Sequence, residues 1–313
     1  MKHAVRILEI GSEHAGRRLD NFLFSVLKNF PKSYVYRIIR RGEVRVNGGR
    51  RKPDSRLALN DKVRIPPHQQ SSIRAPVIAR TWLDEIAKRV VFEDEHLAIV
   101  DKPAALAVHA GSGLDFGVID IMRQISYPQA ELVHRLDRDT SGCLLVAKAP
   151  NICRELQNLF RAGTVDKCYR TLVRGRLAGT EISVDAPLET QRHDQGEAKT
   201  RVSANGKSAQ TIFRPRQHLS IDDEEFSYLD VVLKTGRTHQ IRVHANHVGH
   251  PVVGDRRYGD QTLNQFAQDH GLHRMYLHAV SLAFTHPVTG APVDIQIPES
   301  TELQNFLGLI QGP

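Results

Sequence analysis

A break in the residue pattern at Pro66–Ser72 constrains the fold most, because the stretches on its two sides differ in composition and periodicity. Two prolines followed by polar residues continue neither a helix nor a central strand, and this composition is typical of a domain linker. We therefore expect two domains in the 313 residues. The expected bounds are an N-terminal extension at 1–15, a small domain at 16–75, a linker at 76–88 and a large domain at 89–313.

Charge is divided unequally between these parts. Residues 1–75 contain 17 Lys and Arg but only 6 Asp and Glu, a net charge of +11, whereas the rest contain 26 and 29, a net charge of −3. Positive charge confined to one small domain is typical of a module that binds nucleic acid.

Other features of composition suggest a cytoplasmic protein with no membrane contact. No apolar run approaches the ~18 residues that a membrane span requires. The segment Met1–Arg6 lacks the apolar core of a signal peptide. The three cysteines, Cys143, Cys153 and Cys168, show no Cys-x-x-Cys spacing, so we expect reduced thiols.

The small domain is predicted to contain two helices and a hairpin. Apolar residues recur at helical spacing from Leu19 to Leu27, and Pro31 ends this stripe. A second helix is predicted over Tyr34–Arg41, capped by Ser33 and ended by Gly42. The strand and turn signals that follow are Val44–Val46, the turn Asn47-Gly48-Gly49 and a closing strand at Lys62–Ile65.

This pattern resembles the S4 RNA-binding domain over about 50 residues, through Arg18-Leu-Asp-Asn-Phe-Leu, Ser33–Gly42 and Glu43-Val-Arg-Val-Asn47. The resemblance implies that arginines of the module contact RNA phosphates, which supply salt-dependent affinity rather than sequence choice. The candidate RNA-binding residues here are Arg18, Arg37, Arg40, Arg41 and Arg45.

Beyond residue 90, strands dominate over helices, which favours an α+β fold on a mixed, largely antiparallel sheet. Strands are predicted at residues 90–92, 98–101, 131–136, 143–148, 169–173, 208–213, 228–234, 277–284 and 293–297. Helices are predicted at residues 118–125, 152–161, 239–247, 263–270 and 302–310. The sequence has no convincing Rossmann fingerprint or Walker loop, so we expect no nucleotide cofactor.

The string His134-Arg-Leu-Asp-Arg-Asp-Thr-Ser-Gly142 lies between two of these predicted strands. An acid followed by Thr, Ser and Gly in such a place is an active-site loop pattern, because the flanking strands fix where the carboxylate points. The alternative is an Asx turn, in which Asp137 or Asp139 only caps the backbone.

Three further motifs accompany this string, and together they resemble the pseudouridine synthases of the ribosomal large-subunit family. The motifs are Lys102-Pro103 with Val108-His109, Lys167-Cys168-Tyr169, and Gly236–His244 followed by Gly249-His250-Pro251 and Gly254–Gly259. Asp101 and Ala105 depart from the family's usual Asn and Gly.

The resemblance implies roles for Asp137 and Arg242, and the chemistry and spacing of the side chains suggest roles for Tyr169 and Arg135. Asp137 is the catalytic residue, and Arg242 pairs with it and keeps it charged. Tyr169 stacks on a flipped uracil and relays a proton. Arg135, which would share a strand face with Asp137, fills the helix stack that the flipped base leaves.

Conversion of uridine to pseudouridine breaks the bond from ribose C1′ to N1 and reattaches uracil through C5. This reaction is redox-neutral, so we expect no cofactor and no metal. The carboxylate could attack C1′, stabilise positive charge there, or take a proton from C2′. The resemblance implies 23S ribosomal RNA as substrate and partner, and we expect a monomer.

Three alternatives remain open at this point. The substrate could be another structured RNA such as tRNA. A metal-dependent RNA phosphodiesterase could use His239, His244, His247 and His250 with Asp255, although Arg242 lies within that cluster. The chain could also be a non-catalytic RNA-binding protein.

Overall fold

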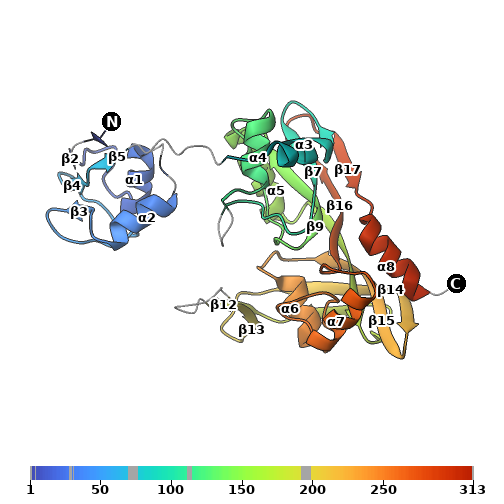
Figure 1. Cartoon of the computed structure of the whole chain (residues 1–313). Helices are drawn as coiled ribbons and strands as arrows, with labels where there is room; N and C mark the ends of the chain where they lie inside the picture. Colours follow the sequence, from blue (N-terminus) through green and yellow to red (C-terminus); the bar gives the residue numbers. More distant parts are fainter. Residues whose placement is uncertain are drawn as a thin grey trace. The chain divides into compact units, whose positions relative to one another are not determined.

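The computed structural model describes residues 2–3, 5–27, 30, 32–69, 77–110, 115–191 and 199–311 (Figure 1). The chain divides into two compact units, Met1–Ala75 and Pro76–Pro313. Within the described ranges, no helix has the length and apolarity that a membrane crossing would need.

The first unit packs two helices against a small antiparallel sheet. Helices α1 (Leu19–Val26) and α2 (Lys32–Arg40) accompany the strands β2 (Arg6–Glu9), β3 (Arg45–Val46) and β4 (Lys62–Ile65), in the order β2-β4-β3. The predicted stripe of α1 is confirmed, because Leu19, Phe22 and Leu23 are buried in one core with residues of α2 and β4. Asn47 and Gly48 both have positive φ, as the predicted two-residue hairpin turn requires.

Several expectations for this unit need correction. The supposed extension at 1–15 contains β2, and the adjoining Ile10 is fully buried in the core, so these residues belong to the module. Ser33 lies inside α2 rather than before it. In the supposed linker, His68–Gln69 forms β5 and pairs with β1 (Lys2–His3). Pro31 and residues 70–76 lie outside the described residues.

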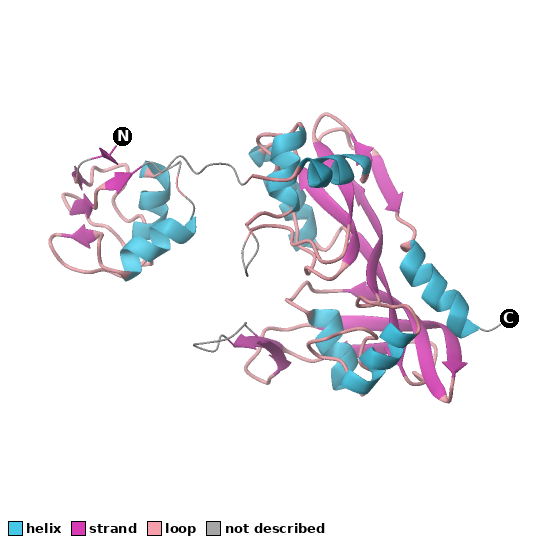
Figure 2. Ribbon diagram, viewed as in Figure 1, coloured by secondary structure: helices cyan, strands magenta, loops and turns pink. Residues whose placement is uncertain are grey.

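The second unit is built on a large mixed sheet, which confirms the α+β class (Figure 2). Its strand order is β11-β14-β15-β10-β16-β9-β7-β6, with β17 beside β16 and β8 beside β9. The strands are β6 (Val90–Glu93), β7 (Leu97–Lys102), β8 (Glu131–Leu132), β9 (Ser141–Ala147), β10 (Asp166–Arg174), β11 (Ile182–Asp185), β14 (Gln210–Ile221), β15 (Glu224–Leu233), β16 (Leu277–Thr285) and β17 (Pro292–Gln296). A separate pair consists of β12 (Leu188–Gln191) and β13 (Lys199–Val202).

Helices cover this sheet and contribute to its apolar cores. The helices are α3 (Arg80–Lys88), α4 (Val118–Ile125), α5 (Pro150–Ala162), α6 (Gln240–His247), α7 (Gln261–Asp269) and α8 (Thr301–Gln311). Helices α3 to α6 contribute Ile86, Ile119, Ile152 and Ile241 to the larger core. Helices α7 and α8 contribute to a smaller core that includes Tyr276.

The pairing of β9 with β16 explains the glycine that ends the string His134–Gly142. These strands run parallel, with Ala279 opposite Gly142. Gly142 has a φ of +103°, and a Cβ there would lie 2.2 Å from the carbonyl oxygen of Ala279. A larger residue would push the strands apart, so glycine is required at this position.

Two sequence expectations for the second unit were wrong. Residues 80–88, assigned to a linker, form α3, whose Ile86 is fully buried. The strand predicted over 131–136 ends at Leu132, so Arg135 and Asp137 lie on a loop and the argument from strand alternation does not apply to them.

Candidate active site

A cavity of about 800 Å³ lies where five segments of the second unit and Thr190 of β12 meet. The segments are 104–109, 135–139, 238–242, 254–257 and 273–275. A smaller cavity of about 80 Å³ extends to Tyr169 and shares Asp137, His239 and Arg242 with the large one. Asp137 therefore borders both spaces.

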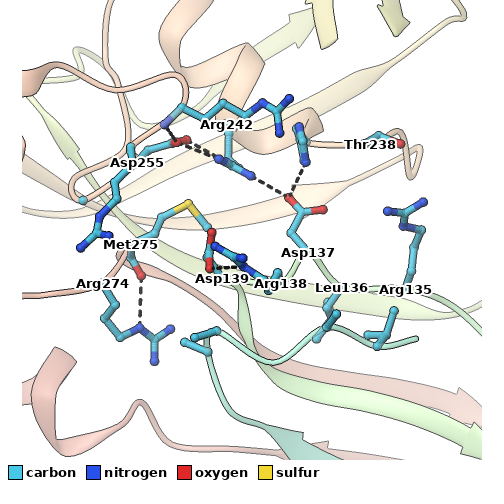
Figure 3. Close-up of a pocket in the computed structure, with 18 of the residues that line it drawn as sticks. Arg135, Leu136, Asp137, Arg138, Asp139, Thr238, Arg242, Asp255, Arg274 and Met275 are labelled. Carbon is cyan, nitrogen blue, oxygen red and sulfur yellow. Dashed lines mark hydrogen bonds and ion pairs between the residues drawn. The ribbon is translucent and has the colours of Figure 1, made fainter. Parts of the chain in front are cut away.

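Asp137 pairs with Arg242 across the cavity (Figure 3). Nη1 of Arg242 donates to Oδ2 of Asp137 at 3.3 Å. The side chains are 6% exposed for Arg242 and 17% for Asp137, so water screens the pair only weakly. The structure thus brings together the two residues that the resemblance pairs.

A second carboxylate, Asp255, holds the other side of Arg242 (Figure 3). Nε and Nη2 of Arg242 donate to its two oxygens at 2.7 and 2.8 Å, and the backbone N–H groups of Arg257 and Tyr258 donate to Oδ1. Burial raises the pKa of Asp255, but the hydrogen bonds and charge of Arg242 outweigh it and hold that pKa below its ordinary value. Burial likewise lowers the pKa of Arg242, and Asp255 and Asp137 more than offset it, so the guanidinium stays charged.

Tyr169 lies on β10 and closes the small cavity. Only 7% of the residue is exposed. Burial, followed by the nearby charge of Asp137, raises the pKa of Tyr169 far above its ordinary value. The hydroxyl therefore keeps its proton at neutral pH, while the ring offers a flat apolar surface beside Asp137.

His239 contacts the same carboxylate from the start of α6. Its Nε2 lies 3.9 Å from Oδ2 of Asp137, and its Nδ1 lies 2.8 Å from the hydroxyl of Tyr258. Arg135 is exposed and lines both cavities, and Figure 3 shows its side chain extending to the same side of the loop as Asp137.

Comparisons with known proteins agree with this geometry. Residues 17–63 match the model of the S4 domain, and residues 96–247 match that of RNA pseudouridylate synthase. A Pasteurella multocida protein named ribosomal large subunit pseudouridine synthase C is 44% identical, over 99% of this chain and 95% of that protein. The Escherichia coli protein of the same name is 42% identical, over 97% of this chain and 96% of that protein.

The chain belongs to the pseudouridine synthase family. A solved structure, human RNA pseudouridylate synthase domain containing 1, aligns with a TM-score of 0.57 and 25% identity, over 67% of this chain and 82% of that one. The protein is thus an RNA pseudouridine synthase, and the alternative of a non-catalytic RNA-binding protein was wrong.

The histidine cluster of the synthase does not converge on one point. The ring nitrogens of His244 contact the hydroxyl of Thr211 and the carbonyl of Ala186, while His250 contacts the carbonyl of Arg174. Across the described ranges, no group of three or more His, Cys, Asp or Glu side chains is placed to hold a metal ion. The side-chain directions therefore do not favour the phosphodiesterase alternative.

The five candidate arginines of the synthase's S4 module differ in the groups that their guanidinium groups contact. Arg18 donates through two nitrogens to Asp20, at 3.1 and 2.7 Å, so a phosphate would compete with a carboxylate already in place. Arg37 lies 5.0 Å above the ring of Tyr34. Arg40 donates to the carbonyl of Tyr36, Arg41 lies 3.9 Å from Glu43, and Arg45 is partly exposed on β3.

Lys102 supports the active-site loop of the synthase, although the sequence gave it no role beyond the Lys-Pro motif. It is fully buried, and its Nζ donates to the carbonyls of Pro103, Leu106 and Arg138 at 2.7 to 2.9 Å. The last of these bonds fixes the backbone next to Asp137. Burial, with a smaller contribution from Arg274, lowers the pKa of Lys102 to about 7, although nearby aspartates oppose the shift.

We expect the pH dependence of stability to reveal this buried amine. The folded pKa is about 7 and the ordinary value 10.5, so the unfolded chain binds more protons between these pH values. The free energy of unfolding should therefore rise as pH increases from 7 to 9, by roughly 1 kcal/mol per unit. Urea titrations of the wild type and Lys102→Met would measure this, and the variant should lose the slope. Lys207→Met, at an exposed position, should keep it; parallel curves for all three would contradict the assignment.

Proposed function

We propose that this enzyme isomerises uridines in 23S ribosomal RNA of the large subunit, with Asp137 as the catalytic carboxylate. The observation that carries the proposal is the place of Asp137, which borders both cavities and is held by Arg242. The names of the relatives support the choice of RNA. The enzyme acts as a monomer in the cytoplasm and needs no cofactor.

The other site residues take roles that fit their positions. The large cavity admits the RNA, and the target uridine turns out of its stack so that its base reaches the ring of Tyr169 in the small cavity. Arg135, at the border of both spaces, fills the gap that the base leaves. Arg242 keeps Asp137 charged and oriented throughout.

Pseudouridine mapping tests the choice of substrate. Purified enzyme would be incubated with transcripts of 23S rRNA, 16S rRNA and tRNA, and new pseudouridines located by carbodiimide adducts. We expect modification at discrete positions of the 23S transcript alone. Those positions should also be unmodified in RNA from cells that lack the enzyme. Efficient modification of tRNA with none in 23S rRNA would overturn the substrate, while leaving the isomerase activity in place.

For the S4 module, we expect Arg37→Gln and Arg45→Gln to flatten the salt dependence of RNA binding. Each lost phosphate contact should reduce the slope of log K against log salt by roughly 0.7–0.9. Binding at several salt concentrations would measure it. Arg80→Gln is the control, because its guanidinium pairs with Asp84 within α3. If both module variants kept the slope of the wild type, these two arginines would not contact phosphates.

A further inference from the structure

The hydroxyl of Tyr258 connects segments of the site that are far apart in the sequence. It lies 2.8 Å from Nδ1 of His239 and accepts a hydrogen bond of 3.1 Å from the backbone N–H of Thr200. Nε2 of the same His239 ring lies 3.9 Å from Oδ2 of Asp137. Tyr258 is not among the described residues that line either cavity, so its hydroxyl acts on the reaction through His239.

The hydrogens in this chain of contacts can be assigned. A phenol oxygen has one hydrogen to donate. Thr200 already donates to the oxygen of Tyr258, so the hydroxyl hydrogen is available to Nδ1 of His239, its other neighbour in the described part of the chain, and we infer that it points there. Burial lowers the pKa of His239 although Asp137 opposes the shift, so the ring is neutral at neutral pH. A neutral ring that accepts at Nδ1 carries its hydrogen on Nε2.

We propose that Tyr258 is a positioning residue for the reaction: it fixes the tautomer of His239 that presents a hydrogen on Nε2 to the carboxylate of Asp137. The proposal rests on Asp137 as the catalytic residue proposed above. Arg242 reaches the same oxygen, Oδ2, at 3.3 Å. Arg242 thus holds this oxygen by a hydrogen bond, while Nε2 of His239 faces it at 3.9 Å, beyond hydrogen-bond distance, and the other oxygen is left for the uridine.

The backbone at His239 supports a functional placement of this ring. Its φ is +56°, in the left-handed region that residues other than glycine seldom adopt. Such a conformation costs energy and persists where the surrounding structure demands it. Here it begins α6 and places the ring between Tyr258 and Asp137, with Arg242 one turn later on the same helix.

Tyr258→Phe tests the hydroxyl by itself. The ring remains to pack against Arg242, whose Cζ lies 5.0 Å from its centroid. The hydrogen bond of the hydroxyl to the neutral ring is worth a rate change of up to roughly tenfold, so we expect kcat to fall by up to that much with KM nearly unchanged. Tyr228→Phe is the matched control, because it removes another buried hydroxyl, 2.7 Å from Glu299, and lies outside the lining of both cavities.

Two substitutions of His239 distinguish the contributions of its two ring nitrogens. The amide nitrogen of Gln lies near the position of Nε2, whereas that of Asn lies near Nδ1. We expect His239→Gln to keep more of kcat than His239→Asn. Asparagine tolerates the left-handed backbone better than glutamine, so backbone strain would produce the opposite order. An Asn variant more active than the Gln variant would overturn the role assigned to Nε2.

Nitrogen-15 NMR of labelled histidine measures the tautomer of His239 directly and does not depend on enzyme activity. The wild type should show the His239 hydrogen on Nε2, and Tyr258→Phe should show a mixture of tautomers. A wild-type rate in Tyr258→Phe, or the same tautomer in both proteins, would overturn the proposal. If the wild type made no pseudouridine in ribosomal RNA, the proposed function would fail, while the NMR measurement would still test Tyr258.

Discussion

Asp137→Asn is expected to abolish pseudouridine formation while folding and RNA affinity survive. The change removes one negative charge with almost no change in volume, and the amide cannot attack C1′, stabilise positive charge there or accept the C2′ proton as a carboxylate does. We expect kcat to fall on the order of a thousandfold or more. Single-turnover assays on 23S rRNA would measure the rate, and filter binding would measure the affinity.

Asp139→Asn is the matched control for this experiment. Asp139 lies two residues further along the same loop, and its carboxylate pairs at 3.2 Å with the exposed Arg138. We expect this variant to retain most of the activity. Substantial turnover by the Asp137 variant, or an equal loss in both variants, would show that Asp137 is not the catalytic carboxylate.

Arg242→Ala is expected to damage both stability and activity. It leaves two carboxylates, Asp137 and the 1% exposed Asp255, without their shared cation. Breaking a buried pair in this way costs about 3 kcal/mol of unfolding free energy. Activity should fall steeply, because Asp137 loses the hydrogen bond that orients its carboxylate.

The stability of the wild type should depend on pH through the carboxylate of Asp255. The pKa of Asp255 is depressed in the folded protein, so its stabilising contribution is present above the ordinary aspartate pKa and is lost as pH falls through the folded value. Arg242→Ala should lack this contribution when urea unfolding is compared at about pH 3 and pH 7. Arg242→Lys, which keeps a charge but not the fork, should be intermediate.

Arg80→Ala is the surface counterpart of this experiment. Arg80 pairs with Asp84 at 3.0 Å, but the side chains are 84% and 52% exposed, and such pairs contribute little to stability. We expect no measurable change. If Arg242→Ala were as stable and active as Arg80→Ala, with the same pH dependence of stability, Arg242 would have no part in holding the two carboxylates.

Patterns within short segments predicted much of the fold. The unbroken apolar run of β9 and the helical spacing of apolar residues in α1 both predict burial from the local sequence alone. Strands β11, β12 and β13 were missed, because their charged and polar residues leave only one or two apolar positions each. Helix α3 was missed, although it contains Trp82, Leu83 and Ile86, because it was assigned to the linker. Their place is set by contacts with distant segments, such as that of Ile86 with the larger core.

The site was predicted less completely than the fold. Asp137 and Arg242 belong to the family's motifs, but the motifs do not predict that Asp255 binds the other side of Arg242. Nor do they say that Lys102 would bond the carbonyl of Arg138. These contacts join segments up to 36 residues apart, and they exist only once the sheet has brought the loops together.

The sharing of one guanidinium between two aspartates gives the centre of this site an excess of one negative charge. A phosphodiester is repelled there, whereas a nucleobase, which is neutral, is not. Arg135, Arg256 and Arg274 line the same large cavity and offer positive charge away from that centre. Electrostatics therefore treat the two halves of a nucleotide differently: the base can approach the carboxylate, while the backbone is kept at the rim. This distribution of charge orients an RNA strand in the cavity without any contact that depends on its base sequence.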